Sequence, residues 1–172
     1  MSKLVLPSIK YKKSYYQFLD ESIKDGRISK GKVDKIKSTN FSEYIKSVKD
    51  LSKGVGVEKG FVPVTEYWLI DNDVFIGNFV VRHKLNKKLM STGGGVGYTI
   101  RPSKRGKGYG KEVLKFGLKK VKRLGFNKVL ITCDKDNTAS KKIIEANGGV
   151  FKNEVFEKGM RVPKLRYWVK LN

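Results

Sequence analysis

The chain has 172 residues, an apolar fraction of 39% and a formal net charge of +22, which favour one domain with a single core. One cysteine and one histidine exclude an internal disulfide, a cysteine-rich metal site and a multi-histidine metal centre. No segment approaches the roughly 20 apolar residues of a membrane-spanning helix, and the first residues lack the apolar stretch of a signal peptide. We therefore expect a cytoplasmic protein that does not engage a membrane.

The positive charge is compatible with nucleic acid, an anionic membrane or a polyphosphate ligand, and it does not select among them. Most of the excess is lysine, spread along the whole chain. A dedicated nucleic-acid binder more often clusters arginines and aromatic residues on one element. Nucleic-acid binding is therefore kept as an alternative and is not favoured.

Two amphipathic helices are predicted at the start of the chain. Residues 8–50 have a helical pattern, in which the first helix ends at Asp25-Gly26 and the second begins with Asn40 as its cap. The segment between the helices, roughly 26–40, contains no readable motif.

The apolar pattern then changes to the alternation of strands. The segments 64–70 and 74–85 are joined by the tight turn Asp71-Asn72-Asp73, which predicts an antiparallel hairpin. The remaining elements are a loop over 86–95, a strand over 96–101, a helix over 108–124, a strand over 128–133, a helix that begins at Asp136 or Asn137 and ends at Gly148-Gly149, and strands over 150–157 and 165–171. The unit 96–133 is typical of a βαβ crossover with its loop at a helix N-terminus.

The loop of this unit lies in the stretch RPSKRGKGYGKEV, residues 101–113. Gly106, Gly108 and Gly110 let the backbone come close to a ligand. The amides from about Gly106 to Lys111 are the unpaired donors of a helix N-terminus and carry the positive end of its dipole. A pyrophosphate fits these features. The basic side chains placed to pair with its charge are Arg105, Lys107 and Lys111.

Two better-known phosphate motifs are excluded at this loop. A P-loop needs G-x-x-x-x-G-K-S/T, but Glu112 follows Gly110-Lys111 and Arg105 stands where the first glycine belongs. A dinucleotide-binding fingerprint fails because its third glycine is replaced by Lys111. The remaining pattern is R-x-x-G-x-G, which leaves an ordinary glycine-rich turn on a lysine-rich surface as the alternative.

Two stretches together resemble the GNAT superfamily of acyl-CoA-dependent N-acetyltransferases. VGYTIRPSKRGKGYGKEVLKF resembles the family's strand-four and pyrophosphate-loop motif, R/Q-x-x-G-x-G/A. VLITCDKDNTASKKIIEANGG resembles its N-x-x-A/S-x-x-x-Y-x-x-x-G motif, with Asn137, Ser140 and Gly148 at matching positions. The resemblance covers about residues 64–172. It implies a bacterial α/β domain whose central mixed sheet is splayed between the strands at 96–101 and 128–133, with residues 1–60 as a variable helical part.

The resemblance also implies acetyl-CoA as co-substrate, with no metal. The backbone near Ile100 would receive the pantetheine arm, and Asn137 and Ser140 would contact it from the other side. The residues implied for the pyrophosphate are Arg105, Gly106, Lys107, Gly108, Tyr109, Gly110 and Lys111. The chain departs from the family's pattern at one position. The family often has a tyrosine seven residues after the asparagine, which protonates the departing thiolate, and this chain has Ile144 there. The candidates for that role are Tyr98, Tyr167 and Cys133.

The acceptor amine arrives mostly protonated, so some group must take a proton. Glu66 is the first candidate, since it alternates with Trp68 and Ile70 on an apolar face, where a carboxylate has a raised pKa. Its alternative role is a surface salt bridge to a lysine. His83 is second, with a half-buried structural role as its alternative.

Other polar and aromatic residues are expected to be structural. Asp134 is a weaker catalytic candidate, with a helix cap or a loop role as its alternative. Cys133 is expected in the core or in the wall of the slot between the splayed strands. The pairs Tyr67-Trp68 and Tyr167-Trp168 are expected to pack in the sheet, or one of each pair to line the acceptor pocket.

The leading hypothesis is direct acetyl transfer to a small-molecule or peptide amine. A catalytically silent nucleic-acid or ribosome binder and a CoA sensor on the same fold are the alternatives. The loops that shape the acceptor pocket carry no motif, so the acceptor stays open, as does the choice between a monomer and a homodimer.

Overall fold

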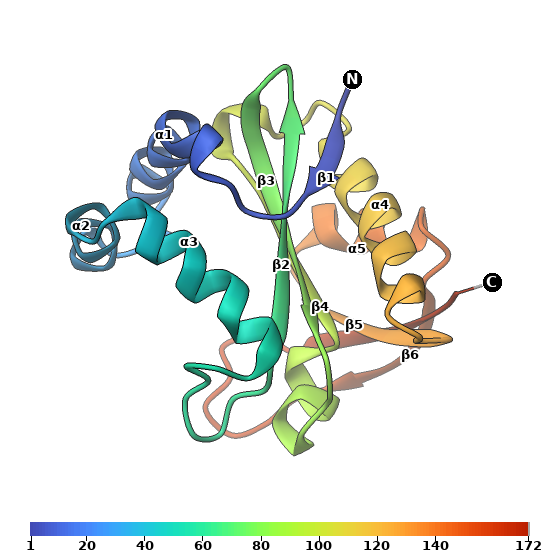
Figure 1. Cartoon of the computed structure of the whole chain (residues 1–172). Helices are drawn as coiled ribbons and strands as arrows, with labels where there is room; N and C mark the ends of the chain where they lie inside the picture. Colours follow the sequence, from blue (N-terminus) through green and yellow to red (C-terminus); the bar gives the residue numbers. More distant parts are fainter. Residues whose placement is uncertain (172) are drawn as a thin grey trace.

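The computed structural model describes residues 1–171 and has two sheets with helices on both sides (Figure 1). The strands are β1 (Lys3–Val5), β2 (Val64–Asp71), β3 (Val74–Arg82), β4 (Val96–Ile100), β5 (Lys128–Asp134), β6 (Val150–Val155) and β7 (Lys164–Lys170). The helices are α1 (Lys12–Lys24), α2 (Lys30–Ser38), α3 (Phe41–Asp50), α4 (Tyr109–Arg123) and α5 (Thr138–Glu145). The short helical turns are η1 (Ile9–Tyr11), η2 (Leu51–Lys53), η3 (Leu89–Gly93) and η4 (Pro102–Lys104).

The strands form one sheet in the order β1-β2-β3-β4 and another in the order β5-β7-β6, and every ladder is antiparallel. The two sheets meet where β4 begins, because Gly95 N donates a hydrogen bond to Leu130 O at 2.7 Å. Beyond this point β4 and β5 diverge. The predicted α/β fold with its splay is confirmed, and the splay is wide enough that each side is a sheet of its own.

Four elements were not predicted from the sequence, namely β1, α2, η3 and the short turn η4. β1 is three residues long and buries only Leu4, which pairs with Leu69 of β2. α2 buries only Val33 among charged neighbours, so it has no apolar stripe to detect. The loop expected over 86–95 contains the helical turn η3, and the strand predicted to reach residue 85 ends at Arg82.

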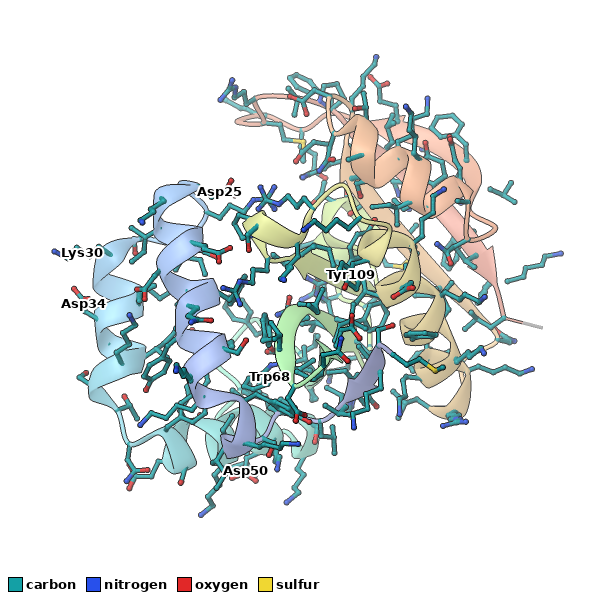
Figure 2. All side chains as sticks on the ribbon, turned by 90° about the horizontal axis from the view of Figure 1, so that it is seen from above. Asp25, Lys30, Asp34, Asp50, Trp68 and Tyr109 are labelled. Carbon is teal, nitrogen blue, oxygen red and sulfur yellow. The ribbon has the colours of Figure 1, made fainter. Side chains whose placement is uncertain are left out.

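Helices α1 to α3 cover one face of the first sheet and α4 covers the other (Figures 1 and 2). On the α1–α3 face, Trp68 is fully buried and stacks on Tyr15 at a ring-centroid distance of 4.6 Å. On the α4 face, a Cβ on Gly117 would lie 2.4 Å from the Phe79 ring. Helix α4 therefore packs so close to β3 that only glycine fits at this position. The neighbouring residues Tyr67 and Trp68 are thereby divided between the two faces, as Tyr67 packs on the α4 side.

Asn40 caps α3 as predicted, since its side chain accepts a hydrogen bond from Ser42 N at 2.9 Å. Among residues 1–171, no helix is both long and apolar enough to cross a membrane.

Candidate functional site

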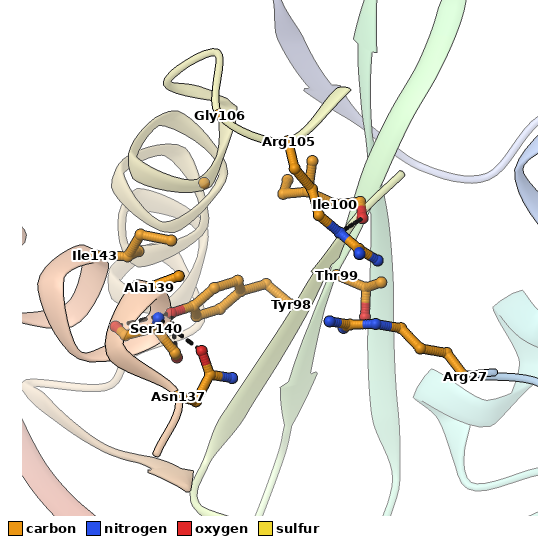
Figure 3. A pocket seen from close by; sticks show the side chains of 11 residues that line it. Arg27, Tyr98, Thr99, Ile100, Arg105, Gly106, Asn137, Ala139, Ser140 and Ile143 are labelled. Atoms are coloured by element: carbon orange, nitrogen blue, oxygen red, sulfur yellow. Dashed lines mark hydrogen bonds between the residues drawn. The ribbon is translucent and has the colours of Figure 1, made fainter. Parts of the chain in front are cut away.

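A cleft of about 180 Å³ lies where β4, the loop before α4 and the start of α5 meet (Figure 3). We call it the β4–α5 cleft. Its lining residues are Arg27, Tyr98, Thr99, Ile100, Arg105, Gly106, Gly110, Asn137, Ala139, Ser140 and Ile143. It therefore brings together residues of both sequence motifs, with Arg27 added from the connection between α1 and α2.

The backbone of β4 presents to this cleft polar groups that do not pair with β3. Arg82 N donates to Gly95 O at 2.9 Å, and Arg101 N donates to Ile76 O at 2.8 Å, so the odd-numbered residues of β4 pair with β3. In an antiparallel ladder the alternate residues point their N–H and C=O groups the other way. Tyr98 and Ile100 therefore direct theirs toward the gap, and Arg105 Nε indeed donates to Ile100 O at 3.3 Å.

The three glycines of the loop are needed for two different reasons. Gly106 and Gly108 have φ of 74° and 84°, which L side chains rarely adopt. A Cβ on Gly110 would lie 2.5 Å from Ile143 Cδ1, so this glycine lets α4 approach α5. The expectation of free amides up to Lys111 is wrong at its end, because Lys111 N donates to Gly108 O at 3.0 Å.

The side chains of the loop divide into two groups. Lys107 and Lys111 are exposed and lie beside the free amides. Tyr109, in contrast, donates its hydroxyl to Asp71 Oδ2 at 2.8 Å, which lowers the pKa of that carboxyl. The Tyr109 side chain thus fastens the start of α4 to the end of β2, and only its backbone faces the loop.

Arg105 is bound by a residue that the sequence did not single out. Its Nη1 and Nη2 donate to the two carboxylate oxygens of Asp25 at 2.8 and 2.7 Å, at the end of α1 (Figure 2). Arg105 and then Arg27 lower the pKa of Asp25 to about 2. A second pair, Arg101 Nη2 to Glu21 Oε1 at 2.6 Å, joins α1 to the same loop. No local pattern could reveal these pairs, because their partners are 80 residues apart.

Asn137 and Ser140 build the opposite wall. Asn137 Oδ1 caps α5 by accepting from Ser140 N at 3.0 Å. Tyr98 Oη and Ser140 Oγ share a hydrogen bond of 2.9 Å that crosses from β4 to α5 (Figure 3). Burial raises the pKa of Tyr98 to about 12, so its hydroxyl keeps its proton at neutral pH. Ile144 is fully buried in the core, so its side chain cannot act in the cleft.

Glu66 lies on the α1–α3 face of the first sheet, with half-buried Asn78, Val80, Gly97 and Thr99. We call this surface the Glu66 face. Glu66 Oε1 accepts from Trp68 Nε1 at 2.9 Å and from Asn78 Nδ2 at 3.1 Å, so both partners are neutral. Burial raises the pKa of the Glu66 carboxyl. The two hydrogen bonds lower it by less, so the pKa lies above the ordinary glutamate value. Both bonds use Oε1, which leaves Oε2 for another partner.

The register places Glu66 of β2 two strands away from β4, the edge strand that lines the cleft. Glu66 stands opposite Val80, and Val80 stands opposite Gly97 of β4. Neighbouring strands are about 4.8 Å apart, so Glu66 lies on the order of 10 Å from β4. A water molecule between them would complete a proton path.

The other acid–base candidates are placed elsewhere. His83 extends the α4-side alternation of β3, and its Nε2 shares a 2.7 Å hydrogen bond with Thr65 Oγ1. His83 and Glu66 thus point to opposite faces. Asp134 pairs with Lys164 at 2.6 Å. Burial raises the pKa of the Cys133 thiol, which disfavours a thiolate nucleophile.

Tyr167 is buried in the core and donates to Glu145 Oε1 at 3.3 Å. Burial raises its pKa to about 12. Its role is packing, as expected for the aromatic pairs on strands.

The splayed strands, the glycine loop and the capped α5 define a fold class that comparison with known families identifies. Residues 40–150 match the acetyltransferase (GNAT) domain, and the chain belongs to this family. No curated protein sequence matches the chain.

Three solved structures illustrate the shared fold. RimJ from Mycobacterium smegmatis, in complex with CoA-disulfide, has a TM-score of 0.73 at 12% identity, covering 98% of this chain and 81% of that one. The Salmonella typhimurium acetyltransferase that modifies the N-terminal serine of 50S ribosomal protein L7/L12 has a TM-score of 0.66 at 14% identity, covering 99% and 95%. The protein yncA from Salmonella typhimurium, solved with its cofactor acetyl-CoA, has a TM-score of 0.64 at 12% identity, covering 99% of this chain and 94% of that one.

Proposed function

We propose that the protein transfers an acetyl group from acetyl-CoA to a primary amine by direct attack in a ternary complex. The β4–α5 cleft carries this proposal, because it joins an unpaired strand edge to a glycine loop at a helix N-terminus. Family membership supports the same reaction. So do the solved relatives of the same fold that hold acetyl-CoA or CoA-disulfide.

The donor would bind along three elements of the cleft. The backbone groups of Tyr98 and Ile100 would receive the pantetheine arm as an added strand. The free amides of Gly106 to Gly110 would hold the pyrophosphate at the positive end of α4. Arg105 is already paired with Asp25. Lys107 and Lys111 are therefore the loop residues best placed to pair with the charge of the pyrophosphate. Asn137 and Ser140 would close the other side.

The chemistry then needs two proton transfers. The amine attacks the acetyl carbon, a C–N bond forms, and the C–S bond to coenzyme A breaks. The amine proton passes through water to Glu66, whose raised pKa makes it a stronger base than an ordinary glutamate. The thiolate takes a proton from the Tyr98 hydroxyl, which regains one from solvent. A β4 backbone amide near Ile100 would stabilise the oxyanion.

The helices of residues 1–60 would complete the acceptor side of a single GNAT domain. They cover the Glu66 face with Tyr15 and Tyr44, whose hydroxyls lie 2.6 Å apart. A small-molecule or peptide amine would approach from this side, opposite the donor. One relative of the same fold modifies the N-terminal serine of a ribosomal protein, which is an amine of this kind.

Calorimetry with acetyl-CoA tests the donor site. Gly108→Val forces a β-branched residue into a left-handed conformation in the loop and should weaken binding at least about tenfold. Gly60→Val is the matched control, because Gly60 has φ of 89° and no atom within 4 Å of its absent Cβ but lies outside the cleft. Equal affinities for both variants would contradict the donor site. Absence of thiol release across an amine panel, with acetyl-CoA bound, would favour a CoA sensor instead.

A further inference from the structure

Arg82 ends β3 and reaches over the Glu66 face. Its Nη1 and Nη2 both lie 3.9 Å from where a Cβ would stand on Gly97, so the guanidinium covers this glycine of β4. Glu66, Val80 and Gly97 stand opposite one another across the three strands. This row of three residues begins with the Glu66 carboxylate on β2 and ends at Gly97 on β4. Gly97 has no side chain, and the Arg82 guanidinium lies over it.

The charge of Arg82 is not neutralised within the described chain. Nη1 donates to Gly93 O at 3.1 Å and to Gly94 O at 3.3 Å, and both acceptors are neutral carbonyls. Across residues 1–171, no carboxylate forms an ion pair with it. The side chain is nonetheless half-buried. A partly buried charge is costly without a counter-charge, and the hydrogens on Nη2 and Nε stay available to an anion.

Arg82 also lines the slot between β4 and β5, a cavity of about 200 Å³. The slot shares Tyr98, Asn137 and Ser140 with the β4–α5 cleft, so it adjoins the place assigned to the donor. Lys164 lines the slot too, but its charge is paired with Asp134 at 2.6 Å. Arg82 is therefore the cation of this slot that is best placed to receive a ligand.

We propose that Arg82 binds an anionic group of the acceptor, so that the preferred substrates are amines that also carry a carboxylate or a phosphate. This inference rests on the proposed function and names the acceptor class. The planar guanidinium matches either anion with two parallel hydrogen bonds. The net charge of +22 attracts anionic and repels polycationic acceptors. The amine of such an acceptor points from Arg82 toward β4 and Glu66.

The hydrogen bonds of Arg82 also fit a purely structural role, because they hold the carbonyl of the last residue of the turn η3 and that of the residue after it. Arg166 supplies a matched control, since its Nη2 donates to Met90 O of the same turn at 2.8 Å. Arg166 lies outside the slot lining. A structural role predicts that Arg82→Gln and Arg166→Gln behave alike.

The test compares acceptors that differ only in the anion. An α-amino acid is compared with its amide, and phosphoethanolamine with ethanolamine, which separates carboxylate from phosphate recognition. One of the two pairs should show an anion preference of about 10- to 100-fold in kcat/KM, the size expected for a charge-assisted hydrogen bond. Arg82→Gln should abolish that preference while kcat/KM for the neutral amine changes less than about threefold. Arg82→Lys, which keeps the charge without the fork, should retain part of it.

The outcomes separate this inference from the proposed function. Equal use of anionic and neutral amines by the unaltered protein would overturn the anion site and leave acetyl transfer standing. An unchanged preference in Arg82→Gln, or the same loss in Arg166→Gln, would also overturn it. Failure to bind acetyl-CoA in calorimetry, with no thiol released by any amine, would overturn the proposed function and this inference with it.

Discussion

The β4–α5 cleft and the Glu66 face lie on two sides of β4 and are built differently. The cleft is made of backbone, with glycines in left-handed conformations, a helix N-terminus and an unpaired strand edge. The Glu66 face is made of side chains held by one another, as Trp68 and Asn78 hold Glu66. A backbone site tolerates many sequences that keep its glycines, whereas each side chain of the other site can be exchanged. We therefore expect substitutions to affect the proposed donor side mainly through its glycines, and the proposed acceptor side through its side chains.

The largest effect that would test this contrast is expected from Glu66→Gln. The amide carbonyl still accepts from Trp68 and Asn78 but cannot take the amine proton. The turnover rate should fall about 100- to 10,000-fold, with acetyl-CoA affinity unchanged in calorimetry. A loss of donor affinity of the same size would show that the two sides are not separate.

The same variant has a stability signature with a definite sign. Burial raises the folded-state pKa of Glu66, so the folded protein holds this proton more tightly than the unfolded chain. The free energy of unfolding that the protonated Glu66 contributes is thus fully present at low pH. It is lost as pH rises from the glutamate pKa of the unfolded chain, about 4.3, through the folded-state pKa. Glu66→Gln removes that loss, so Tm at pH 8 should rise relative to the parent. An equal gain at pH 4 would contradict the linkage.

Tyr98→Phe tests the proposed acid of the cleft. Removing the hydroxyl should lower the turnover rate by about 10- to 100-fold if it protonates the departing thiolate. Ser140→Ala is the control, because it removes the 2.9 Å partner but leaves the acid. Equal losses in both variants would assign Tyr98 a positioning role only.

Asp25→Asn should change the donor side by a smaller factor. It weakens the two-point pair that occupies Arg105, so acetyl-CoA affinity at low salt should rise a few-fold and become more salt-dependent. Asp20→Asn is the matched control on the same helix, since Asp20 pairs with Lys37 away from the loop. Weaker binding in Asp25→Asn alone would show that the pair organises the loop.

The smallest effect is a shift of the pH profile by Asn78→Ala. The Asn78 hydrogen bond lowers the Glu66 pKa against the effect of burial, so its loss raises that pKa. The acid limb of kcat/KM should therefore move to higher pH, while the plateau stays within about twofold. A shift to lower pH would exclude Glu66 as the titrating base.

Much of the β4–α5 cleft, the proposed donor side, was predictable because its determinants are local. Gly106, Gly108 and Asn137 act through their own backbone or that of a near neighbour, and the structure brings both motifs to one cleft. The acceptor side depends on register and on contacts between distant residues. No pattern in the sequence places Arg82 over Gly97 on this side. The Asp25–Arg105 pair of the proposed donor side is equally hidden, because its partners are 80 residues apart. α2 was missed because one buried residue, Val33, leaves no periodic signal.

The two sheets touch through the backbone at Gly95 and Leu130, and farther along Tyr98 of β4 is hydrogen-bonded to Ser140 of α5 and not to β5. The gap is thus a wedge with a fixed apex and an adjustable mouth. A ladder would fix its width at one strand spacing, but beyond Gly95 no ladder joins β4 to β5 in the described part of the chain. Substitutions of the side chains that line the gap should therefore change the room for the acyl group of the proposed donor without breaking a strand pairing.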